Sequence, residues 1–289
     1  MDFLTSPKIF NMIKSVFLPL AAAVLFLFSD CNHANKSCCG DAASTEKFAG
    51  LGDQKAFQDA HPAPLPTDTV HSGEMIKFAV QSGAEANAYF VKKNDSDRYL
   101  MLFHEWWGLN DYIKREADFY ANALNINVLC PDLYDGKVAT DADAAGKLMG
   151  ANDKNRSAAI VAGAFKRVGK KATVRTLGWC FGGGWSCQAA LIGGKQTVGC
   201  VIYYGMPEED VARLATLNCD ALGIFASQDK WINKDVVSKF EANMKKANRS
   251  LTVKWFEADH AFANPSSPHF MEKPAQEARE LTLAYLKGK

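Results

Sequence analysis

Apolar residues fall into short continuous runs from about Met75 onward, and these runs alternate with longer segments of helical period. Short apolar runs predict strands that are buried on both faces, as in a parallel sheet. The predicted strands cover residues 75–80, 87–91, 99–103, 127–130, 174–179, 198–204, 221–226 and 251–256. The predicted helices include residues 111–124, 153–168, 185–191, 234–246 and 274–286. The pattern therefore predicts an α/β fold with a mainly parallel central sheet and helices on both faces.

The N-terminus has a different pattern. Lys8 and Lys14 precede an apolar stretch over residues 15–28, which is short for a bilayer span of roughly 20 residues but typical of a signal-peptide core. Cys31 follows it, as the lipidated cysteine follows the signal of a bacterial lipoprotein, although Asp30 stands where such signals carry a small residue. We expect residues 1–31 to be an export signal with Cys31 as the lipidation site. Simple signal cleavage and an uncleaved membrane anchor are the alternatives.

Residues 32–72 are rich in Ala, Ser, Gly, Pro and charged residues and show no sustained apolar period. This composition predicts a flexible linker, which leaves residues 73–289 as the globular domain. Export would place that domain at the cell envelope, either lipid-anchored or periplasmic. We expect it to meet the membrane only through the N-terminal anchor or signal.

Charge and cysteine content exclude two classes of partner. The 33 basic and 32 acidic residues create no basic field that would attract nucleic acid. The eight cysteines contain no CxxC pair of the kind that binds zinc. Most of the later cysteines sit in apolar runs, which predicts buried thiols.

The connection between the strand at 174–179 and the next helix carries the clearest chemical signal. Residues 178–182 (GWCFG) have the glycine-x-nucleophile-x-glycine form of a nucleophile elbow. Glycines flank the nucleophile because side chains there would collide where the backbone turns sharply. The start of a helix also favours a thiolate over a thiol. We predict that Cys180 is a catalytic nucleophile; the alternative is a buried structural cysteine in a glycine-rich connection.

Two further residues follow Cys180 in the order that a triad has on this kind of fold. Asp229 comes just after the strand at 221–226, and His260 just after the strand at 251–256. The imidazole would deprotonate the thiol, and the carboxylate would orient the imidazole. Asp259 is the alternative acid, but on an extended segment its side chain should point away from that of its neighbour.

The loop after the strand at 99–103 contributes to the same predicted site. The backbone N–H groups of Trp106 and Phe181 are the expected donors of an oxyanion hole. Glu105 is a carboxylate in an aromatic setting, so if it is buried it needs a partner such as the Cys180 thiol or an arginine. Its alternative role is that of a surface acid.

Together these segments resemble the dienelactone hydrolase family of α/β-hydrolases, from about Met75 to the C-terminus. The family uses a cysteine nucleophile with histidine and aspartate, which match Cys180, His260 and Asp229, and a glutamate that accepts from the thiol, which matches Glu105. The matching motifs are HEWWGLND at 104–111, CPDLYDGK at 130–137, GWCFGGG at 178–184, YYG at 203–205, QD at 228–229 and DHAFANP at 259–265.

The resemblance implies an α/β-hydrolase fold and hydrolysis of a small-molecule ester or lactone, with no metal or organic cofactor. It implies that Tyr203 is the family's active-site tyrosine and that Trp107 and Asn264 line the substrate pocket. Members that cleave dienelactone hold its carboxylate with two arginines, one of them four residues after the histidine. Here that position is Asn264, and the second arginine has no clear match, which argues against dienelactone as the substrate.

Two other functions remain open at this point. A non-catalytic binding or scaffold protein at the cell envelope would keep the fold without turnover. A thiol redox protein would need a resolving cysteine nearby, but Cys187 lies seven residues after Cys180, about two helical turns away.

Overall fold

The computed structural model describes residues 43–64, 71–81 and 83–289, all of which belong to one compact unit that spans Cys38–Lys289. The predicted signal over residues 1–31 and the predicted lipidation site Cys31 lie outside the described residues. Within the described ranges, no helix combines the length and the apolar composition that a membrane span requires.

In this part of the chain, eight strands form one sheet in the order β1-β2-β4-β3-β5-β6-β7-β8. The β1/β2 and β2/β4 pairs are antiparallel, and all other pairs are parallel, which confirms the predicted mainly parallel sheet. The strands are β1 (Glu74–Phe78), β2 (Ala86–Val91), β3 (Arg98–Phe103), β4 (Asn127–Pro131), β5 (Thr173–Trp179), β6 (Thr197–Tyr203), β7 (Ala221–Ala226) and β8 (Leu251–Phe256).

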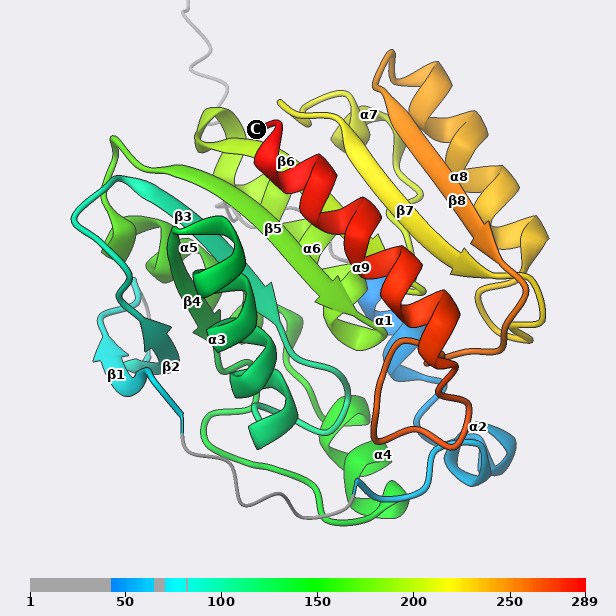
Figure 1. Cartoon of the computed structure of the whole chain (residues 1–289). Helices are drawn as coiled ribbons and strands as arrows, with labels where there is room; N and C mark the ends of the chain where they lie inside the picture. The colour runs from blue at the N-terminus through cyan, green and yellow to red at the C-terminus, as the bar shows by residue number, and fades with distance from the viewer. Residues whose placement is uncertain (1–42, 65–70, 82) are drawn as a thin grey trace, which may run out of the picture. The chain divides into compact units, whose positions relative to one another are not determined.

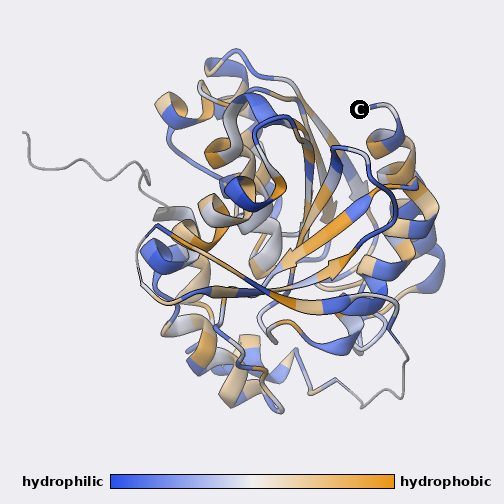
Figure 2. Ribbon diagram, turned by 90° about the vertical axis from the view of Figure 1, so that its left-hand side faces the viewer, coloured by the Kyte–Doolittle hydropathy of each residue, from blue (hydrophilic) through white to orange (hydrophobic). Residues whose placement is uncertain are grey.

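Burial along the strands depends on their place in the sheet. All side chains of β4 and β7 are buried, as their continuous apolar runs predict. The prediction that every strand is buried on both faces is wrong for the two edge strands, where exposed and covered side chains mix, and Trp255 of β8 is 39% exposed. An edge strand pairs on one side only and meets solvent on the other. In Figure 2, hydrophobic residues (orange) predominate in strands that lie between helices, and the helices carry both hydrophobic and hydrophilic residues.

Helices cover both faces of the sheet. In Figure 1, α3 and α9 lie in front of the sheet and contact each other, while α5 and α6 lie behind it and also contact each other. The longer helices are α3 (Asp111–Leu124), α4 (Ala142–Gly150), α5 (Lys154–Val168), α6 (Phe181–Gly193), α8 (Lys234–Lys246) and α9 (Glu272–Lys287), with a short α7 (Val211–Leu214) and a 3₁₀ turn (Gly194–Gln196).

Two short helices, α1 (Ala43–Ala49) and α2 (Lys55–Asp59), occupy a part of the chain that was predicted to be a flexible linker. That prediction is wrong for this part, because α1 packs against α6 and α4, and α2 packs against α4. The contact is so close that a Cβ added to Gly52 would lie 2.8 Å from the carbonyl oxygen of Gly146 in α4. The folded body of the protein therefore includes residues before the predicted boundary at 73.

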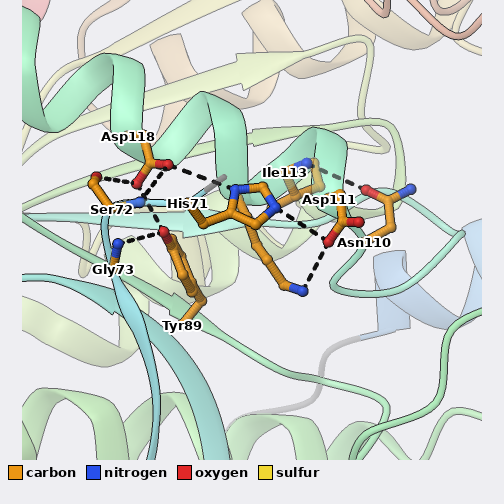
Figure 3. A network of polar contacts seen from close by, with 9 residues as sticks. His71, Ser72, Gly73, Tyr89, Asn110, Asp111, Ile113 and Asp118 are labelled. Atoms are coloured by element: carbon orange, nitrogen blue, oxygen red, sulfur yellow. Dashed lines mark hydrogen bonds and ion pairs between the residues drawn. The ribbon is translucent and has the colours of Figure 1, made fainter. Parts of the chain in front are cut away.

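A polar network fixes the chain where it enters β1 (Figure 3). The imidazole of His71 lies between two carboxylates of α3, with Nε2 3.3 Å from Asp111 and Nδ1 3.6 Å from Asp118. The backbone N–H and the hydroxyl of Ser72 donate to Asp118 at 3.1 and 2.7 Å, and the hydroxyl of Tyr89 donates to the same carboxylate at 2.8 Å. These contacts tie the chain to α3 immediately before β1.

Candidate active site

Cys180 occupies the turn between β5 and α6. Its φ of +56° lies in the left-handed region, which is strained for a residue with a side chain, and its N–H donates to the carbonyl of Tyr203 at 3.0 Å. A Cβ at Gly178 would collide with the carbonyl of Gly182, and a Cβ at Gly182 would collide with the carbonyl of Phe103. The two glycines therefore permit the close approach of strand and helix that holds Cys180 in this conformation.

The thiol of Cys180 is buried, and burial raises its pKa above the usual value. The imidazole of His260 and the backbone N–H of Phe181 act in the opposite direction but do not overcome burial, and the nearby Glu105 raises the pKa further. Burial therefore opposes the effect of the helix N-terminus, which favours the thiolate. The surroundings solvate a charged sulfur poorly, which disfavours the thiolate.

The structure brings His260 and Asp229 together, with Nδ1 of His260 2.6 Å from Oδ2 of Asp229. The other carboxylate oxygen, Oδ1, accepts from the N–H groups of Trp231 and Ile232 at 2.8 and 2.9 Å. Burial opposes the charge of Asp229, but His260 and these N–H groups outweigh it and lower the pKa of Asp229. The carboxylate is thus ionised and oriented by the backbone.

His260 is fully buried, and burial alone would lower its pKa, yet the carboxylate of Asp229 and the thiolate form of Cys180 favour the imidazolium and raise that pKa. Nε2 forms no well-aligned hydrogen bond with any described residue, although Cys180 and His260 lie close enough to shift each other's pKa. Catalytic hydrogen bonds are often long before substrate binds. The alternative acid, Asp259, does not contact the imidazole: it accepts from the backbone N–H of His260 at 2.7 Å.

Glu105 has a different partner from the two that were expected. Its carboxylate accepts a hydrogen bond from the side-chain amide of Asn264, whereas no described arginine contacts it. Burial raises the pKa of Glu105 to about 7, while His260 and the Asn264 amide act against that rise. Glu105 is 6% exposed, so the alternative of a surface acid is wrong. The carboxyl group changes its charge close to neutral pH.

His104, next to Glu105, has a structural role. Its Nδ1 lies 2.7 Å from the carbonyl of Glu105, and its Nε2 accepts from the N–H of Leu133 at 3.1 Å. A carbonyl can only accept, so Nδ1 carries the proton and the imidazole is neutral, in line with the pKa that burial lowers. His104 thus fixes the loop that carries Glu105 and Trp106.

A small cavity lies over the thiol, and an adjoining cavity shares Glu105 and Asn264 with it. The expected pocket residues Trp107 and Asn264 both line the first cavity, as does Trp106. None of the described residues that line either cavity is arginine or lysine. The site therefore offers no cationic clamp for a substrate carboxylate.

Tyr203 is not placed as the resemblance implied. Its hydroxyl lies 2.6 Å from Thr282 Oγ1, and it lines neither cavity. The strand β6 ends at Tyr203, and Tyr204 then adopts a φ of +33°, which brings its ring to 5.0 Å from that of His260. Tyr204, which sequence reasoning placed inside the strand, is thus the tyrosine beside the triad.

Sequence reasoning also missed His61, which follows α2 and lines the cavity over Cys180. Nearby, Phe57 of α2 packs with ring centroids 5.9 Å from His260 and 5.0 Å from Trp106. A pair of phenylalanines, Phe48 and Phe57, in an otherwise polar segment was the one sequence signal for this packing. Among the described residues, no group of three or more His, Cys, Asp or Glu side chains is arranged to hold a metal ion.

Comparison with known sequences identifies similar proteins. The family model described as the dienelactone hydrolase family matches residues 86–288. Protein usf of Aquifex pyrophilus is 28% identical over 229 residues, which cover 74% of this chain and 98% of that protein. Carboxymethylenebutenolidase 1 of Cupriavidus pinatubonensis is 24% identical over 230 residues, which cover 73% of this chain and 95% of that protein.

Solved structures show the same fold. A dienelactone hydrolase-like promiscuous phosphotriesterase from metagenomic libraries has a TM-score of 0.65 at 17% identity, over 75% of this chain and 98% of that one. Dienelactone hydrolase from Anabaena variabilis has a TM-score of 0.55 at 15% identity, over 75% of this chain and 99% of that one. At such identities the likeness concerns the fold, which confirms the α/β-hydrolase class.

Proposed function

The chain belongs to the dienelactone hydrolase family, and we propose that it hydrolyses uncharged esters or lactones through a thioester on Cys180. Membership of this family makes it an ester or lactone hydrolase and does not favour the non-catalytic alternative. The observation that carries the mechanism is His260, which is hydrogen-bonded to Asp229 and faces the thiol of Cys180 in a buried pocket.

In the first half of the proposed reaction, Nε2 of His260 takes the proton of the Cys180 thiol as the sulfur attacks the substrate carbonyl. Asp229 stabilises the imidazolium that forms. The N–H groups of Trp106 and Phe181 hold the oxyanion of the tetrahedral intermediate. The intermediate collapses to a thioester, and the alcohol leaves with the proton from His260.

In the second half, His260 takes a proton from a water molecule, whose oxygen attacks the thioester carbonyl. The second tetrahedral intermediate collapses, the carboxylic acid leaves, and the sulfur of Cys180 recovers the proton from His260. Transfer of the proton to His260 during the attack suits a buried thiol, because the raised pKa of Cys180 disfavours a free thiolate.

The proposed preference for uncharged substrates follows from the charges of the pocket. No arginine or lysine lines the two cavities among the described residues, and Glu105 becomes negative above pH 7. A substrate carboxylate would therefore meet a neutral amide and a like charge. Esters and lactones without an anionic group avoid both.

We also propose that the protein is exported and anchored through a lipid on Cys31, as the sequence over residues 1–31 predicts. Expression of the full chain in a bacterium tests this proposal. The wild type should appear in the membrane fraction and become labelled by a fatty-acid analogue. Cys31→Ser should lose the label; a variant that keeps the label would contradict the assignment.

Hydrolysis assays on the full chain test the catalytic proposal. The substrates are small neutral aryl esters, lactones and thioesters. Cys180→Ala should abolish turnover, and Asp229→Asn should lower kcat by a factor of about 10² to 10⁴ because the imidazole loses its orienting anion. Cys187→Ala, which changes a buried thiol of α6, the helix that follows Cys180, is the matched control and should retain activity. Activity that is unchanged in Cys180→Ala would refute the nucleophile assignment.

A further inference from the structure

Two residues that line the cavity over Cys180, His61 and Pro62, come from outside the region that matches the family. His61 follows α2, whereas the family match begins at residue 86. The residue is 5% exposed, and its ring lies 5.2 Å from the rings of both His260 and Trp106. The N-terminal segment therefore supplies part of the wall around the reacting atoms.

The surroundings hold His61 in place. Phe57, one turn earlier, is fully buried and packs edge-on against Trp231 at 4.9 Å and beside the His61 ring at 4.3 Å. α1 is tied to the body by a hydrogen bond from Gln188 to Ser44 at 3.2 Å. A ring fixed in this way can discriminate between ligands, because it cannot turn away from a poor partner.

The hydrogen bonding of His61 determines which of its ring nitrogens donates and which accepts. Nδ1 lies 2.6 Å from the carbonyl of Phe57, which can only accept, so Nδ1 carries a proton. Burial and the neighbouring His260 lower the pKa of His61 to about 3, so the ring is neutral. Nε2 is therefore a hydrogen-bond acceptor, and it has no partner among the described residues.

The amide of Asn264, which lines the same cavity, is already engaged on both sides. Its nitrogen donates to Glu105, and its oxygen accepts from the N–H and the hydroxyl of Ser266 at 2.8 and 2.7 Å. Nε2 of His260 is required for proton transfer. Nε2 of His61 is the other buried imidazole nitrogen of this site that has no partner among the described residues, so it is available for recognition.

We propose that His61 determines specificity, and that its Nε2 accepts a hydrogen bond from a hydroxyl or amide N–H group of the substrate. This inference rests on the proposed function. The favoured substrates are uncharged esters or lactones that carry such a donor close to the reacting carbonyl. A substrate without the donor leaves a buried acceptor unpaired, which is unfavourable.

Matched substrates isolate this hydrogen bond. The lactone pair is γ-butyrolactone and its α- or β-hydroxy derivative. The ester pair is phenyl N-acetylglycinate and its N-methyl counterpart, in which a methyl group replaces the amide hydrogen. For wild type we expect kcat/KM to be at least about tenfold higher for the donor-bearing member of a pair. In His61→Phe, which keeps an aromatic ring without the acceptor, that ratio should fall to about one. In His61→Gln, which restores an acceptor, the ratio should partly recover.

If His61 has only a structural role, His61→Phe should lower kcat/KM by the same factor for both substrates of each pair. The ratio between the two substrates would then stay as in wild type, and that result would overturn the proposal. Binding provides a readout that needs no turnover. Cys180→Ala should bind the hydroxylactone more tightly than γ-butyrolactone, and the double variant with His61→Phe should not. If hydrolysis persists in Cys180→Ala, the proposed function fails, whereas the binding difference still tests His61. Equal binding of both lactones by Cys180→Ala would refute the inference.

Discussion

The carboxylate of Glu105 accepts a hydrogen bond from the amide of Asn264, so residues 159 positions apart in the sequence share one wall of the pocket. The amide neutralises no charge, which leaves burial free to raise the pKa of Glu105 to about 7. A cation at position 264 would neutralise the Glu105 carboxylate and lower its pKa.

Asn264→Arg should therefore change substrate preference. A guanidinium beside Glu105 would lower the pKa of that carboxyl and offer a partner for a substrate carboxylate. We expect the ratio of kcat/KM for a carboxylate-bearing ester to that for its neutral methyl ester to rise about tenfold or more. Asn264→Gln, which keeps the amide, is the control. A ratio that rises equally in both variants would disprove the charge argument.

Glu105 should also make stability depend on pH. Its pKa is raised in the folded protein, so its contribution is fully present below the unfolded pKa near 4.5 and is lost as the pH rises through about 7. A pKa shift from about 4.5 to about 7 corresponds to about 3 kcal/mol of unfolding free energy. Glu105→Gln should thus gain stability over wild type between pH 5 and pH 8, by up to that amount, in urea unfolding. A difference between the two proteins that does not vary with pH would contradict the raised pKa.

The reactivity of Cys180 toward a small uncharged alkylating agent should follow its raised pKa. Only the thiolate reacts, and burial disfavours the thiolate, so the rate should still rise above pH 8.5, where an ordinary exposed cysteine is half ionised. Because His260 lowers the pKa of Cys180, His260→Ala should move the profile to higher pH. Cys180→Ala gives the background from other thiols. A rate that reaches its plateau below pH 8.5 would show that the thiolate is already the resting form.

The elbow should tolerate no side chain at Gly182. A methyl group there would collide with the backbone carbonyls of Phe103 and His104, so α6 would move away from β3 and carry Cys180 with it. We expect Gly182→Ala to lose about 3 kcal/mol or more in unfolding free energy and most of its activity. Gly150→Ala, also in a helix but with its nearest neighbour 3.8 Å from the added Cβ, should gain up to about 1 kcal/mol. Similar stability of the two variants would contradict the packing at the elbow.

The sequence allowed the sheet to be predicted because each strand combines a continuous apolar run with a clear end. The bounds of β7 and β8 agree with the prediction. α3 and α8 also agree, since each follows an asparagine, Asn110 or Asn233, whose side chain accepts from the first turn of the helix. In these elements local sequence and tertiary structure favour the same conformation.

Other features depend on contacts that no local pattern reports. Helices as short as α1 and α2 are not stable alone, and here they form because α4 and α6 cover them. Tyr204 lies beside His260 because the backbone turns at a positive φ where an extended strand was predicted. The raised pKa of the Cys180 thiol follows from its burial, which the elbow motif does not reveal.

The most direct test of the account is to identify the acylated residue during turnover. Wild-type enzyme is mixed with an excess of a small aryl ester, quenched in acid within the first turnovers and mapped by peptide mass spectrometry. We predict an acyl group on Cys180 as a thioester, with at most one per chain, and no adduct in Cys180→Ala. Turnover with the acyl group on another residue, or undiminished turnover by Cys180→Ala, would contradict the central claim.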